Sequence, residues 1–144
     1  MSHDDEFNGN LLFELSQIRK ELDVLLRMIG GRKRLGNDEI KIRAAASSLQ
    51  SIYNGIERML QMSLKQKDLL VPQGNASHAE LLTSAVDNGI ISETVGSDLR
   101  ELMAFRHFYR HSYGFLIDNE LLNPLLGRIE TLVAVLTSEL HLEK

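Results

Sequence analysis

The chain has 144 residues and a mass of 16.3 kDa, which predicts one domain at about 150 residues per domain. An apolar share of 43% and a net charge of −4 exclude a disordered chain. The absence of cysteine excludes disulfide scaffolds and thiol nucleophiles and suits a reducing cytoplasm. No apolar run reaches the roughly 18 residues of a membrane span, and the polar, acidic start is unlike a signal peptide. We therefore expect one cytoplasmic domain over residues 1–144, with residues 1–9 as a flexible N-terminal tail.

Two long amphipathic helices are predicted in the first half of the chain. Apolar residues recur at three- and four-residue steps from about Asn10 to Ile29, and the glycines at 30–31 suit a left-handed C-terminal cap. A second helix is expected to begin at Asn37 and Asp38 and could reach Lys67, before a proline and a glycine break the pattern.

Two shorter helices follow. Ser77 and Glu80 have capping-box spacing, so Ser77 is expected to open the third helix, which ends at the Asn-Gly pair 88–89. The fourth helix is expected to begin at Ser92 and to continue to about Tyr113, where the next residue is a glycine.

The last helix is predicted from an Asn-Pro pair. Asn123 suits an N-cap and Pro124 suits the first helical position, after a turn at residues 118–120. Five helices with short connections predict an all-α protein, an antiparallel helical bundle in which the apolar stripes form the core.

The end of the fourth predicted helix departs from this simple pattern. Residues 106–113 hold two arginines, two histidines and two tyrosines, although the whole chain has only five histidines. At roughly 100° per residue, the cationic and titratable side chains fall within an arc of about 160°. The residues of this arc are Arg106, His107, Arg110, His111 and Tyr113. Apolar side chains occupy another sector and can anchor the helix.

Arg106 and His111 do not lie on one line along the helix, because five residues correspond to about 140° of rotation. The long arginine side chain could swing towards the imidazole. A distorted helix end or a dimer partner could also close the gap. The sequence leaves these alternatives open.

This combination of side chains suits the cleavage of RNA. Histidine titrates near pH 6.5 and can exchange a proton at cellular pH, while arginine stays charged and binds phosphate oxygens with a planar fork. Removal of the 2′-hydroxyl proton starts a transesterification that gives a cyclic phosphate and a free 5′-hydroxyl. An adjacent arginine would stabilise the charge that develops on the phosphate. Such cleavage needs no metal.

Ordinary structural roles are the alternatives for the same residues. Arg106 could form a surface salt bridge with Glu101 or Asp98, and His111 could interact with the negative end of the helix dipole. His107 and His111 are four residues apart and could share a metal ion, but the sequence offers no third ligand, so we expect no metal site.

The chain resembles a known family through the motif Arg-x4-His-x-Tyr, formed by Arg106, His111 and Tyr113. It is similar to the HEPN superfamily and, within it, to the HepT-like toxins. The runs 53–57 and 77–82 also look like that group, so the resemblance extends from about residue 45 to the end. Family membership would account for the motif, the all-α pattern and the size together.

The resemblance implies a metal-independent endoribonuclease toxin without a cofactor, in which two protomers line a shared cleft. Arg106 would bind the scissile phosphate and His111 would act as general base or acid. His107 stands where the family often has asparagine, and we assign it and Arg110 to RNA contact. Tyr113 matches the tyrosine that a cognate minimal nucleotidyltransferase antitoxin modifies with AMP.

Two other classes of function remain as alternatives. One is a non-catalytic HEPN module that binds a nucleotide or a nucleotidyltransferase partner through the same cationic side. The other is a structural bundle whose apolar stripes serve oligomerisation. The intact Arg106–His111 pair favours the nuclease, because an inert protein could lose either residue.

Overall fold

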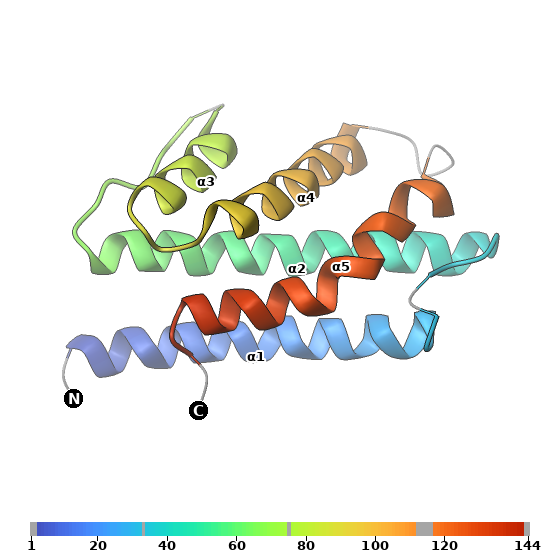
Figure 1. The fold of residues 1–144 in the computed structure, drawn as a ribbon, viewed down its shortest axis with the longest axis horizontal. Coiled ribbons are helices and arrows are strands. Elements are labelled where there is room, and N and C mark those ends of the chain that lie inside the picture. Colours follow the sequence, from blue (N-terminus) through green and yellow to red (C-terminus); the bar gives the residue numbers. More distant parts are fainter. Residues whose placement is uncertain (1–2, 33, 75, 112–116, 143–144) are drawn as a thin grey trace.

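The computed structural model describes residues 3–32, 34–74, 76–111 and 117–142. Within these ranges the chain forms five α-helices and no strand, which confirms the predicted all-α bundle. The helices are α1 (His3–Ile29), α2 (Glu39–Gln66), α3 (Ser77–Asp87), α4 (Glu93–His111) and α5 (Asn119–Glu139). α1 and α2 form a long antiparallel hairpin, and the shorter helices α3 and α4 lie along α2 (Figure 1). α2 packs against all four other helices and is the centre of the fold.

The apolar stripes predicted for α1 and α2 form the core. All members of the α1 stripe are buried, and so are those of the α2 stripe, which meets α1 on one side and the remaining helices on the other. An ion pair also links α1 to α2, because Arg58 Nε and Nη2 both lie 2.7 Å from Glu14 Oε1. The buried stripe residues are Leu11, Leu15, Ile18, Leu22, Leu25 and Ile29 in α1, and Ile42, Ala45, Leu49, Ile52, Ile56, Met59 and Leu64 in α2.

The predicted ends of the hairpin helices are confirmed. Gly30 has φ 71° and its N–H donates to the Leu26 carbonyl, as expected for a left-handed cap after α1. Asp38 is the N-cap of α2, where its side chain accepts hydrogen bonds from the backbone N–H groups of Ile40 and Lys41. Local chemistry therefore fixes the length of the connection between α1 and α2.

The predicted flexible tail at residues 1–9 differs from the structure. α1 begins at His3, so residues 3–9 belong to the helix. Phe7 is partly buried and packs against the core, so this otherwise polar stretch has an apolar contact with the rest of the fold. Packing against the rest of the fold supports the helix where local periodicity was weak.

The expected capping box of α3 is wrong. Ala76 is the N-cap and no side chain caps the helix, because Ser77 is already its first residue. The turn at Gly74, with φ 97°, brings its carbonyl to the Ser77 N–H at 3.2 Å and sets the entry of the chain. At the other end, α3 finishes at Asp87 with Asn88 as its C-cap, which agrees with the prediction.

The expected start of α5 is also wrong. The helix begins at Asn119 with Asp118 as N-cap, so residues 119–120 of the predicted turn are helical and Pro124 lies inside α5. Asn123 does not cap the helix. Its amide accepts from the Leu35 N–H at 2.7 Å and donates to the Leu35 carbonyl at 3.2 Å. The helix bends along its length (Figure 1), as expected where proline removes a backbone hydrogen bond.

Within the part of the chain that the structure describes, α5 alone is long and apolar enough to cross a membrane by length and composition. Its most apolar window has a mean hydropathy of 1.2, and 44% of that window is buried inside the fold. The apolar residues of α5 therefore contribute to the core, as in the core helix of a folded domain.

Two glycines in helices give a matched pair of stability predictions. A Cβ at Gly55 would lie 2.7 Å from Ile18 Cγ1, whereas a Cβ at Gly127 would meet nothing within 4 Å. Gly55→Ala is expected to lower the free energy of unfolding by about 1–3 kcal/mol through overpacking. Gly127→Ala is expected to raise it by about 0.5–1 kcal/mol through helix propensity. Urea unfolding checks both values, and equal effects of the two substitutions would contradict the close α1–α2 approach.

Candidate functional site

Arg106 reaches from α4 into the space where α4, α2 and α3 meet. The side chain is partly buried, and its Nε donates to Asn54 Oδ1 of α2 at 2.7 Å. Its Nη1 lies 3.4 Å from Nε2 of His78 in α3. Two neighbouring helices therefore hold one guanidinium, and the side chain is oriented before any ligand binds.

His78 is held in turn by a buried carboxylate. Its Nδ1 lies 2.9 Å from Oε1 and 2.8 Å from Oε2 of Glu57. The Glu57 side chain is only 8% exposed, whereas the His78 side chain is 41% exposed. Because a carboxylate accepts hydrogen bonds, Nδ1 carries the proton and Nε2 is the basic nitrogen of the neutral ring. We name Asn54, Glu57, His78 and Arg106 the Arg106 cluster.

The packing of α3 against α4 brings the cluster together. Asn54 and Glu57 are three residues apart and so share a face of α2. Arg100 donates to Thr83 Oγ1 at 2.8 Å, one turn or more from the contact between Arg106 and His78. The two contacts follow antiparallel helices, with the start of α3 beside the end of α4.

Tyr53 adds a buried polar group beside the cluster. The residue is 0% exposed, and its hydroxyl has no hydrogen-bond partner within the described ranges. Burial, followed by the neighbouring Glu57 carboxylate, raises the pKa of Tyr53 well above its usual range. The hydroxyl is therefore a neutral phenol at cellular pH, and the positive charge of the cluster comes from Arg106.

The other predicted site residues of α4 face solvent. His107, Arg110 and His111 are exposed, and the two imidazole rings lie with their centroids 4.4 Å apart. The structure thus brings His107 and His111 together. Among the residues it describes, no contact joins Arg106 to His111. The predicted residue Tyr113 lies outside the described residues.

The salt bridges considered for Arg106 are formed by another arginine. Arg128 of α5 pairs with Asp98 at 3.4 Å and also with Glu101, so these carboxylates link α4 to α5. This interpretation of Arg106 as an ordinary surface ion pair is therefore wrong. The Arg106 guanidinium instead contacts Asn54 and His78 of the Arg106 cluster.

The end of α4 is suited to an anion. The sequence has no acidic residue from position 102 to 117, a stretch that holds Arg106, Arg110 and two histidines. Glu57 is the carboxylate of the cluster, and it lies behind His78 in the interior. No group of three His, Cys, Asp or Glu side chains in the described ranges is arranged to hold a metal ion.

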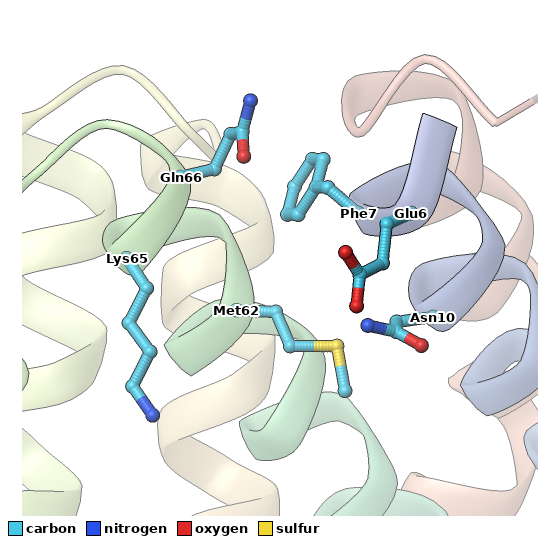
Figure 2. A pocket seen from close by; sticks show the side chains of 6 residues that line it. All are labelled: Glu6, Phe7, Asn10, Met62, Lys65 and Gln66. Atoms are coloured by element: carbon cyan, nitrogen blue, oxygen red, sulfur yellow. The ribbon is translucent and has the colours of Figure 1, made fainter. Parts of the chain in front are cut away.

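A separate cavity of about 260 Å³ lies where the start of α1 meets the end of α2. Figure 2 shows Glu6, Phe7 and Asn10 of α1 facing side chains of α2 across it. None of the residues that line it belongs to the Arg106 cluster or to the exposed face of α4. The cavity is thus separate from the groups with catalytic chemistry.

Sequence reasoning missed the contribution of α2 and α3. In the sequence, His78 and Glu57 stand only within the family-like runs 77–82 and 53–57. A signal was present, because a carboxylate within an apolar stripe requires a partner when the helix is buried. The partner itself is 21 residues away and could not be identified from spacing.

Comparison with known proteins gives one family match. A family model described as HepT-like protein matches residues 44–142, a span that includes every residue of the Arg106 cluster and the exposed face of α4. No curated protein and no solved structure matches the chain. At the level of the family, the match points to an RNase-type enzyme of toxin–antitoxin systems. The chain belongs to the HepT-like family of HEPN proteins.

Proposed function

We propose that this protein is a metal-independent endoribonuclease toxin of a toxin–antitoxin module that acts in the cytoplasm. Arg106 binds the scissile phosphate and stabilises its developing charge. His111 transfers a proton as general base or acid. His107 and Arg110 contact the RNA backbone beside it. The reaction is a transesterification that breaks the P–O5′ bond and forms a 2′,3′-cyclic phosphate.

The orientation of Arg106 is the observation that carries this proposal. A surface arginine that served only solubility would not be held by an amide at 2.7 Å and an imidazole at 3.4 Å. Two guanidinium nitrogens are engaged by these contacts. Within the described residues no hydrogen bond is made by Nη2, which suits binding of an anion from solvent.

Because Arg106 and His111 make no contact within the described chain, the active form proposed is a homodimer. Pairing of two copies along the ends of α4 would place exposed imidazoles of one protomer near the guanidinium of the other. The exposure of His107, Arg110 and His111 leaves this face available for such pairing and for RNA.

The proposed partner is a cognate minimal nucleotidyltransferase antitoxin. Transfer of AMP to Tyr113 would add bulk and a negative charge two residues after His111. The added charge would repel a phosphate of the RNA. The modification would therefore neutralise the toxin without unfolding it.

Cleavage of RNA in a chelator tests the proposed function. The purified protein is expected to cleave single-stranded RNA in EDTA and to leave cyclic phosphate ends. His111→Ala is expected to slow this cleavage by about 10²–10⁴-fold, because a proton-transfer group is lost. The helical circular dichroism spectrum should not change, since His111 is exposed.

Three outcomes would contradict the proposal. Cleavage that requires added metal, or that survives His111→Ala, would remove the assigned mechanism. Binding of ATP or of a nucleotidyltransferase without any RNA turnover would instead favour a non-catalytic HEPN binding module.

A further inference from the structure

We infer that His78 is a second catalytic histidine, the general base that removes the proton from the RNA 2′-hydroxyl. This inference rests on the proposed ribonuclease function and deepens it. Transesterification needs two proton transfers, one from the 2′-oxygen and one to the 5′-oxygen, whereas the Arg-x4-His motif supplies one histidine per chain.

Glu57 fixes the orientation of the His78 imidazole. Glu57 accepts from Nδ1 through both carboxylate oxygens, at 2.9 and 2.8 Å. This contact fixes the ring and leaves the lone pair on Nε2, on the side away from the carboxylate. A buried carboxylate that orients a histidine in this way is the arrangement that serves general-base catalysis in hydrolases.

The second nitrogen of the His78 ring, Nε2, faces Arg106. Nε2 lies 3.4 Å from Nη1 of Arg106, which is longer than a strong hydrogen bond. A phosphate oxygen that binds the guanidinium would take the N–H of Nη1 and release Nε2. The ribose attached to that phosphate carries the 2′-hydroxyl, so the base would stand beside the proton that it removes.

The His78 imidazole is partly accessible to solvent. The His78 side chain is 41% exposed, although the carboxylate behind it is 8% exposed. The imidazole thus keeps partial access to solvent, and a ligand can approach it from that side. Asn54 and Glu57 are positioning residues, since they hold Arg106 and His78.

The proposed reaction requires two proton transfers and the exchange of one P–O bond for another. His78 Nε2 takes the 2′-hydroxyl proton, the 2′-oxygen forms a bond to phosphorus, and the P–O5′ bond breaks. The 5′-oxygen takes a proton from His111, which is thereby assigned the role of general acid. The products are a 2′,3′-cyclic phosphate and a 5′-hydroxyl, with no oxidant, metal or other reactant.

Single-turnover cleavage by the full chain tests the assignment. His78→Ala is expected to slow cleavage by about 10²–10⁴-fold, and His78→Gln, which can still donate to Glu57, is expected to be equally slow. Added imidazole should raise the rate of His78→Ala in proportion to its concentration. His141→Asn is the matched control, because His141 is exposed, lies away from the cluster, and has φ 58°, which asparagine tolerates.

A substrate with a sulfur atom in place of the bridging 5′-oxygen separates the two histidines. A thiolate leaves without a proton, so this RNA should restore the rate of His111→Ala but not that of His78→Ala. Circular dichroism and thermal melting confirm that each variant is folded.

The inference is overturned if His78→Gln keeps wild-type activity while Arg106→Ala and His111→Ala are inactive, and the proposed function then stands. It is also overturned if imidazole gives no rescue, which would show that His78 only positions Arg106, or if the sulfur substrate rescues His78→Ala. A wild-type protein that does not cleave RNA, or cleavage that is indifferent to Arg106 and His111, would contradict the proposed function itself.

Discussion

Replacing Arg106 by alanine is expected to slow RNA cleavage by about 10²–10³-fold, the usual effect of removing one group that stabilises transition-state charge. Arg106→Lys is expected to recover only part of this loss. Lysine keeps the positive charge, but it cannot donate to Asn54 through Nε while two further nitrogens face the phosphate. Single-turnover rates with a fluorescent RNA measure both effects.

The control for Arg106 is an arginine with an ordinary role. Arg43 pairs with Glu39 one turn earlier on α2, at 3.0 Å, and both side chains are largely exposed. Arg43→Ala is therefore expected to leave the rate unchanged and to alter stability by less than about 1 kcal/mol. Equal rates for Arg43→Ala and Arg106→Ala would show that the held guanidinium has no part in the reaction.

Mixing two inactive variants is expected to restore cleavage. In the proposed dimer the Arg106 of one protomer works with the His111 of its partner, so a heterodimer of Arg106→Ala and His111→Ala contains one intact composite site. Random exchange makes half of the dimers mixed, which gives about a quarter of the wild-type activity. The physical reason is the geometry of α4, where the two side chains make no contact within the described chain.

The matched control replaces one component by the double variant. Arg106→Ala mixed with Arg106→Ala/His111→Ala supplies no arginine and should stay inactive at every ratio. Absence of recovery in the first mixture, although subunit exchange is demonstrated by native mass spectrometry, would mean that both groups act from the same chain.

Much of the fold was available from periodicity alone. The stripe from Leu11 to Ile29 and the stripe from Ile42 to Leu64 are buried as predicted, because a helix that must hide an apolar face has few ways to do so. The caps at Gly30 and Asp38 were also predictable, since each uses the local chemistry of one residue. The start of α5 was not, because Asp118 and Asn123 are both good N-caps.

Tertiary contacts decided between those two caps. Asn123 forms hydrogen bonds with the backbone of Leu35, which is 88 residues away in the chain, and Asp118 caps the helix. Pro124 remains inside α5, where packing of the helix offsets the lost hydrogen bond. Phe7 extended α1 by the same kind of long-range contact.

For the site, the sequence by itself determined the residue types at the end of α4 and the family to which they belong. It placed Arg106 and His111 about 140° apart on one helix, which already argued against a simple pair. Only the tertiary structure decided what faces Arg106. Asn54 and His78 are 52 and 28 residues away from it, and Glu57 is 21 residues from His78. Helical periodicity specifies neighbours three or four residues apart, whereas contacts across such separations arise only when whole helices pack together.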